Sequence, residues 1–181
     1  MSDSEWDLTI KEFCDSHGAC RRGQKWALDN CKSMQECWKR LPAEWLLWVA
    51  TRDGVLTDKE LRLFAVFCCR EIWHLLTDER SRKAVETAER YANGQATAEE
   101  LAAAHDAAIA AGIDALDLAV RNVVWCAART VEFATQPVAW AAVAGAANFL
   151  LHATPTIARD TTRRVQAAWL RANTTPCFKA K

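Results

Sequence analysis

One segment, residues 57–76 (TDKELRLFAVFCCREIWHLL), constrains the fold more than any other part of this chain. Thr57 and Glu60 form a capping-box pattern, in which each side chain satisfies a backbone N–H group of the first helical turn. Apolar residues follow on nearly every side of the helix, so other elements must cover it. We therefore predict a buried central helix over residues 57–76. On this helix, the residues expected to be exposed or to form ion pairs are Arg62, Arg70 and Glu71.

The rest of the chain carries helix signals and no strand pattern. Caps, glycines and prolines delimit further helices at about residues 9–16, 21–30, 33–38, 42–52, 77–94, 98–111, 113–134, 138–152 and 154–172. Gly112 and the Gln136-Pro137 pair are the predicted breaks in the alanine-rich part, and the tail after Ala172 is predicted to be frayed. The predicted fold class is all-α, a compact array of about eight to ten helices in antiparallel hairpins around the central helix.

Length and composition bound the domain organisation. The chain has 181 residues, of which 51% are hydrophobic, enough for a substantial core. We expect a single all-helical domain over residues 1–181. A subdivision falls near residue 95, between a Trp/Cys-rich helical core (1–95) and an alanine-rich helical part (96–175). The net charge of zero and its even spread argue against nucleic acid as a partner.

The sequence also predicts where the protein resides. The N-terminal residues are polar and acidic, unlike a signal peptide. The most apolar run, residues 138–151, is shorter than the roughly 20 residues that a membrane-spanning helix needs. We therefore expect a cytoplasmic protein with no membrane association. Its eight cysteines are then expected to be reduced, and most should pack as small apolar residues.

The first candidate for chemistry is a cysteine–histidine set, with Cys14, His17 and Cys20 in one short stretch and Cys31 and Cys37 downstream. Zinc binds such sets, but the spacing differs from that of the familiar zinc sites. The alternative is that His17 and the following glycine end a helix, with the cysteines packed beneath it. We favour this alternative, and expect no metal and no cofactor.

A second candidate lies in the charged turns at the two ends of the central helix. A histidine beside carboxylates can perform acid–base chemistry, but no nucleophile is placed nearby. A cationic histidine at a helix C-terminus and acids at a helix N-terminus are also favourable by themselves. We therefore expect no catalytic residues and no enzyme activity. A structural elbow that joins two helices explains these residues better than catalysis does, and an exposed binding surface is the intermediate interpretation. The candidate binding residues are Arg52, Asp53, His74, Asp78, Glu79, Arg80 and Arg82.

The nine tryptophans are many for a chain of this length. Each lies on an apolar helix face, so most are expected in the core. Tryptophan and arginine dominate the energetics of protein interfaces. Any tryptophan that is exposed should therefore mark a partner surface.

Two strings carry a resemblance to a known family. They are HGACRRGQKWALDNCKSMQECW and EWLLWVATRDGVLTDKELRLFAVFCCREIWHLLTDERSRKAVETAERYANGQATAEELAAA. Over about residues 10–110 the chain resembles a family of all-helical immunity proteins of bacterial polymorphic toxin systems, which includes phage-associated proteins. The alanine-rich part agrees in composition alone, and the C-terminal end departs from the family. The resemblance implies binding to a toxin domain, and it transfers no functional residues.

The sequence thus predicts a non-catalytic cytoplasmic protein-binding protein, with neutralisation of a toxin domain as its role. One alternative is a self-associating helical scaffold, in which alanine-rich faces and tryptophans form a homo-oligomer interface. A second alternative is a phage counter-defence inhibitor, and a zinc-binding protein is the least favoured. The balanced charge counts mildly against an inhibitor that recognises its target by opposite charge.

Overall fold

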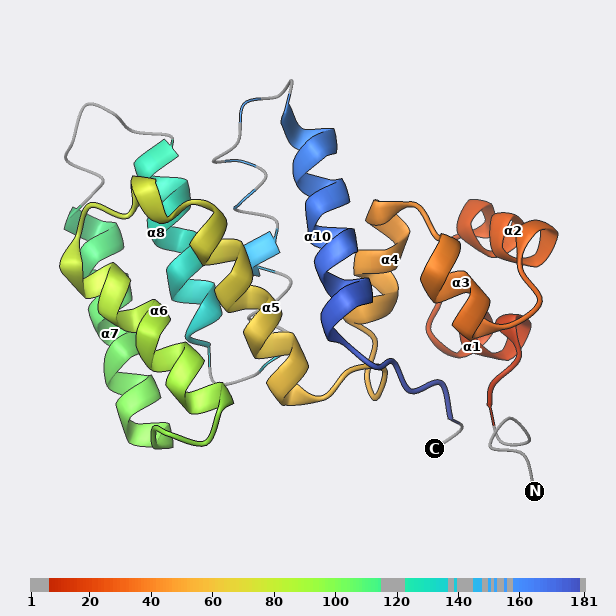
Figure 1. Ribbon diagram of the computed structural model, residues 1–181, viewed down its shortest axis with the longest axis horizontal. Coiled ribbons are helices and arrows are strands. Elements are labelled where there is room, and N and C mark those ends of the chain that lie inside the picture. The colour runs from red at the N-terminus through yellow and green to blue at the C-terminus, as the bar shows by residue number, and fades with distance from the viewer. Residues whose placement is uncertain are drawn as a thin grey trace.

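The chain is mainly helical in the part that the computed structural model describes (Figure 1). That part comprises residues 7–114, 123–136 (123–128 in backbone alone), 139, 145–147, 150, 152, 155 and 158–179. Its helices are α1 (Ile10–Ser16), α2 (Arg21–Asn30), α3 (Met34–Arg40), α4 (Ala43–Ala50), α5 (Asp58–Glu71), the 3-10 helix η2 (Trp73–Leu75), α6 (Glu79–Ala92), α7 (Ala98–Asp114), α8 (Val123–Ala134) and α10 (Arg159–Asn173). The predicted all-α class is confirmed.

Side-chain caps place the start of four helices where the sequence predicts them. Thr9 and Thr57 each form a capping box with the glutamate three residues later. The Ser33 hydroxyl accepts an N–H group from the first turn of α3, and the Thr97 hydroxyl does the same for α7. These N–H groups have no partner inside their own helix, so local sequence is enough to fix the boundary.

The predicted central helix corresponds to α5, which packs against α6, α8 and α10 (Figure 1). Its buried residues lie on several sides of the helix, as a segment that is apolar nearly all round requires. The helix ends at Glu71, before the predicted end at residue 76. The N–H group of Ile72 bonds to the Cys69 carbonyl three residues back, and this tighter winding leads into η2 and turns the chain toward α6.

Arg62 is buried, which contradicts the exposed position that was one of its two predicted alternatives. Its side chain is only 3% exposed, and its guanidinium donates to the carbonyls of Ala134 (3.2 Å) and Gln136 (2.9 Å) at the C-terminal end of α8. Burial lowers the pKa of the guanidinium, although an arginine keeps its charge in a protein. Arg70, by contrast, is exposed and pairs with Glu89 at 2.7 Å, as predicted.

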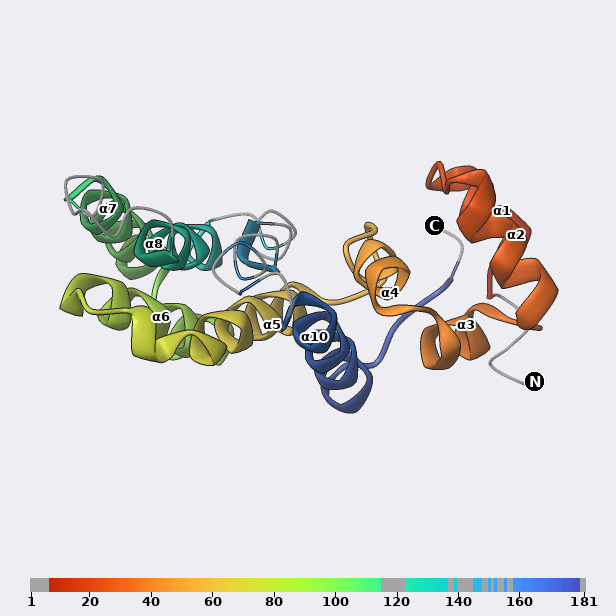
Figure 2. The same ribbon diagram turned by 90° about the horizontal axis from the view of Figure 1, so that it is seen from above.

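Four helices form two layers at one end of the molecule. In the view from above, α7 and α8 form one layer, and α5 and α6 form the layer next to it (Figure 2). The neighbouring helices of this group pack against one another. The predicted break at Gly112 is wrong, because α7 continues through this buried glycine to Asp114. A glycine inside a helix costs about 1 kcal/mol of stability. The packing of α7 against α6 and α8 contributes more stabilisation than this cost. Most of the predicted helix 138–152 lies outside the described residues.

The C-terminal part returns to the beginning of the chain. Helix α10 packs against α4 and α5, and Arg171 near its end donates to the carbonyls of Trp38 (3.0 Å) and Leu41 (2.6 Å) at the end of α3. The first and last described residues therefore lie together at one end of the molecule, where Asp7 and Lys179 form an isolated antiparallel bridge (Figure 1). In the described part of the chain, no helix combines the length and the apolar character that crossing a membrane requires.

The tail is extended and docked, so the prediction that it is frayed is wrong. Phe178 is 2% exposed, and its ring contacts the rings of Phe13 and Trp38. The Phe178 carbonyl accepts the Leu8 N–H group at 2.8 Å, and the Cys177 N–H group bonds to the Val55 carbonyl at 2.8 Å. One buried aromatic side chain and these backbone bonds outweigh the entropy of ordering a short tail.

Arg62→Met should lower the free energy of unfolding by about 3 kcal/mol, because two carbonyls at the end of α8 lose a charged donor. Arg70→Met on the same helix should cost less than about 1 kcal/mol, because Arg70 pairs in solvent. Urea denaturation of both variants measures the difference. Equal small losses would show that Arg62 does not hold α8.

Phe178→Ala should lower the free energy of unfolding by at least about 3 kcal/mol, because it removes a fully buried aromatic ring. Thr175→Ala, which alters an exposed side chain in the same tail, should change it by no more than about 0.5 kcal/mol. Thermal or urea unfolding tests the pair. A Phe178→Ala protein as stable as the wild type would contradict a docked tail and support the prediction that the tail is frayed.

Candidate functional site

Two short helices meet at a tight turn near the N-terminus. His17 ends α1, and the next residue, Gly18, takes a φ of 66°, a conformation that favours glycine. The chain then begins α2 with Cys20 as its N-cap, whose Sγ accepts the Gly23 N–H group at 3.3 Å. This turn places the thiol of Cys20 beside the space enclosed by the first four helices.

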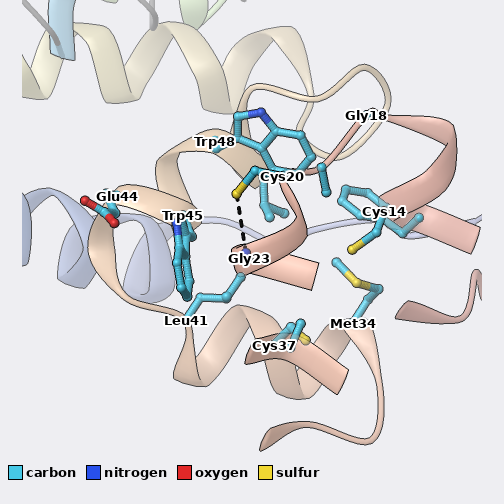
Figure 3. A pocket seen from close by; sticks show the side chains of 14 residues that line it. Cys14, Gly18, Cys20, Gly23, Met34, Cys37, Leu41, Glu44, Trp45 and Trp48 are labelled. Atoms are coloured by element: carbon cyan, nitrogen blue, oxygen red, sulfur yellow. Dashed lines mark hydrogen bonds between the residues drawn. The ribbon is translucent and has the colours of Figure 1, made fainter. Parts of the chain in front are cut away.

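That space is an apolar pocket with a volume of about 330 Å³, lined by residues of α1, α2, α3 and α4 and of the turns between them (Figure 3). Its lining is mostly aromatic, aliphatic and sulfur-containing, and among the 14 described residues that line it Glu44 is the one charged residue. Pockets of a few hundred cubic ångströms with mostly apolar walls are typical of binding sites. We take this pocket as the candidate functional site.

Two tryptophans of α4 form one wall of the pocket. The rings of Trp45 and Trp48 are half-buried. The Trp45 ring makes an edge-on contact with Trp26 of α2, with centroids 5.8 Å apart, and Trp48 packs edge-on against Phe13 of α1 at 6.4 Å. Such edge-to-face contacts stabilise the orientation of both rings. The wall is therefore held from two other helices.

The buried thiols of the pocket act as apolar lining. Cys14 and Cys37 are both buried, and burial raises the pKa of each thiol above its ordinary value. A thiol that stays protonated is a weak nucleophile and a poor metal ligand. Cys14 and the buried Met34 both line the pocket (Figure 3). These groups offer a soft, polarisable surface to an apolar ligand.

Cys20 and Glu44 are the exposed polar residues of the lining. Cys20 lies at the start of α2, and the Glu44 carboxylate lies on the Trp45 side of the pocket (Figure 3). Arg22 is close by, with its guanidinium carbon 5.7 Å from the centroid of the Trp45 ring, but it does not line the pocket. The rim thus combines a thiol, a carboxylate and a neighbouring cation.

Of the predicted binding residues, Arg52 contacts a wall residue of this pocket. The Arg52 guanidinium stacks 4.7 Å from the centroid of the Trp48 ring, and its Nε donates to the Trp48 carbonyl at 3.0 Å. Arg52 therefore supports a wall residue of the pocket. With Asp53 it also lines a separate polar hollow of about 670 Å³, which includes His17.

The remaining predicted residues follow the C-terminal end of α5, whereas Arg52 and Asp53 precede its N-terminal end. The 14 residues of α5 span about 21 Å. Asp78 caps α6, and Arg80 donates to the carboxylates of Asp78 and Asp114, each at 2.6 Å. The bond from Arg80 lowers the pKa of the Asp78 carboxyl. Arg80 thereby ties the start of α6 to the end of α7.

Arg82, from the same predicted group, stacks on the Trp73 ring at 5.6 Å, and Arg70 stacks on that ring at 4.3 Å. His74 and Glu79 are exposed at the same turn. The charged side chains of this turn therefore join neighbouring helices. None of them lines the pocket. Of the predicted binding residues, the structure therefore places Arg52 against a pocket wall and gathers the others in the turn between α5 and α6.

The cysteine–histidine set does not converge as a metal site. Within the described residues, no group of three or more Cys, His, Asp or Glu side chains is arranged to hold a metal ion. His17 stacks on Phe13 with ring centroids 4.4 Å apart, and its Nδ1 lies 3.0 Å from the Phe13 carbonyl. The interpretation of His17 as the end of a helix is confirmed.

Sequence reasoning missed the pocket itself, although α4 carries a signal for it. Trp45 and Trp48 are three residues apart and share one face, whereas Leu46 and Ala50 face the core. A short helix that is apolar on two faces must cover one of them with something other than the core. Here the second face borders a pocket.

No protein family, curated protein or solved structure matches this chain.

Alkylation by iodoacetamide, mapped by mass spectrometry, should label Cys20 and Cys177 in the native protein, because both are exposed. Cys14 and Cys37 should react only on unfolding, since burial and a raised pKa leave little thiolate. A ligand in the pocket should slow Cys20 and leave Cys177 unchanged. Labelling of Cys14 at the rate of Cys20 would contradict the described burial.

Proposed function

We propose that this chain is a non-catalytic binding protein, and that a partner protein inserts an apolar side chain into the pocket between α1, α2, α3 and α4. The observation that carries the proposal is the pocket of about 330 Å³ with half-buried tryptophans in its wall. Interface hot spots are pockets of this kind, in which a large anchor residue is removed from water. Neutralisation of a toxin domain, the role that the resemblance implies, would be one case of such binding.

The lining supports binding rather than catalysis. Its inward groups are rings, alkyl chains and protonated thiols, and these cannot exchange protons with a substrate near neutral pH. Glu44, the one charged group, has no histidine or second carboxylate beside it in the lining. Apolar burial is the interaction that such a surface provides.

The size of the pocket favours one large side chain over an extended ligand. A cavity of about 150 Å³ holds one benzene molecule. The pocket, at about 330 Å³, therefore accommodates a group of roughly two aromatic rings, such as an indole. Burying an aromatic side chain of this kind contributes on the order of 3 kcal/mol to affinity.

Indole, a neutral probe, tests the pocket by ligand-observed NMR with the full chain. It should bind the wild type. It should not bind Gly23→Leu. A Cβ added at position 23 would lie 3.3 Å from Cys20 Sγ and 3.9 Å from the Trp45 ring, so the larger leucine side chain would fill the pocket. Lys25→Leu is the matched control, because it adds the same side chain to the exposed face of α2.

Ala27→Leu provides a second filled pocket, one helical turn further along α2, if Gly23→Leu does not fold. A partner captured from cells of the source organism should be lost with both filled variants and retained with Lys25→Leu. Equal indole binding by the wild type and the filled variants would overturn the proposal. A partner that the filled variants retain would do the same.

A further inference from the structure

We propose that the partner's anchor is an aromatic side chain with a lysine or arginine beside it in the chain, and that this cation pairs with Glu44. The inference rests on the proposed function, because it names the chemistry that the same pocket selects. It adds a specificity-determining residue, Glu44, and a sequence feature of the partner. A bare apolar pocket would accept any large side chain, whereas a charged rim discriminates among them.

The position of Glu44 supports a role toward a ligand. It lies in the first turn of α4, it is exposed, and it is the one charged residue among the 14 that line the pocket. The N-cap residue of α4 is Pro42, and its side chain forms no capping hydrogen bond. In the part of the chain that the structure describes, no cation pairs with it.

The aromatic wall favours the same ligand. The electron-rich faces of tryptophan rings attract cations, and Trp45 lies next to Glu44 in the wall. The protein already uses this interaction nearby, since Arg22 lies over Trp45 and Arg52 over Trp48. A cation that follows an inserted aromatic group would therefore meet a carboxylate and ring faces at the rim.

Arg22 opposes the attraction between the rim and a cationic ligand group, so its removal provides a second test. Its guanidinium lies 5.7 Å from the Trp45 centroid and carries the same charge as the proposed ligand group. Its removal should strengthen the binding of a cationic ligand, whereas the removal of Glu44 should weaken it. Opposite effects of two charges near one ring would not arise from a loss of structure.

Three host peptides that differ only at two central residues test the inference by NMR titration of the full chain. Their centres are Trp-Arg, Trp-Glu and Ala-Arg. The Trp-Arg peptide should bind at least about fivefold more tightly than Trp-Glu, the ratio for about 1 kcal/mol between unit charges roughly 4 Å apart in water. The Ala-Arg peptide should not bind. The preference should shrink in 1 M salt, because these charges are exposed.

Variants of Glu44 and Arg22 test whether the preference for the Trp-Arg peptide over the Trp-Glu peptide arises at the rim. Glu44→Gln should weaken it, because the ring faces still attract the cation. Glu44→Lys should reverse it, and Arg22→Gln should widen it. Glu71→Gln, which removes an exposed carboxylate at the end of α5, is the matched control and should leave it unchanged.

Four outcomes separate the two proposals. Equal binding of Trp-Arg and Trp-Glu would overturn the inference and leave the proposed function intact. An undiminished preference in Glu44→Gln would also overturn the inference. Binding of neither indole nor any tryptophan peptide would overturn both. Tighter binding of tryptamine than of the Trp-Arg peptide would assign the pocket to a free aromatic amine, and would overturn the protein-anchor proposal.

Discussion

Arginines that cap helices from elsewhere in the chain hold this fold together. Arg62 on α5 donates to the carbonyls of Ala134 and Gln136 at the end of α8, and Arg171 on α10 donates to two carbonyls at the end of α3. Arg40 on α3 donates to the last carbonyl of α2. The last carbonyls of a helix have no partner within it, and a guanidinium offers five donors with a fixed geometry. Each such bond fixes one helix end to another helix.

The candidate pocket depends on these long-range contacts. Its walls come from four helices of 7 to 10 residues each, and isolated helices of that length are not stable in water. Arg171 holds the end of α3, and Phe178 of the tail packs against Phe13 of α1 and Trp38 of α3. The C-terminus of the chain therefore helps to shape a site built from N-terminal residues.

Different parts of the structure could be predicted to different degrees. The starts of α1, α3, α5 and α7 follow from a side chain that caps its own helix, which is a local interaction. The buried position of Arg62, the docked tail and the continuation of α7 through Gly112 were not predictable, because each depends on a partner distant in the sequence. The candidate site behaved in the same way: Arg52 lies against a pocket wall, whereas Arg80 and Arg82 join helices elsewhere.

The sequence by itself determined the all-α class, the caps and the apolar faces, because these depend on helix periodicity and on neighbours within one turn. It also determined that residues 57–76 had to be covered by other helices. Only the tertiary structure decided which arginine is buried, where the tail binds and which apolar faces meet without filling the space between them. A pocket is the space that several side chains leave unfilled, so it exists only once the helices have been placed.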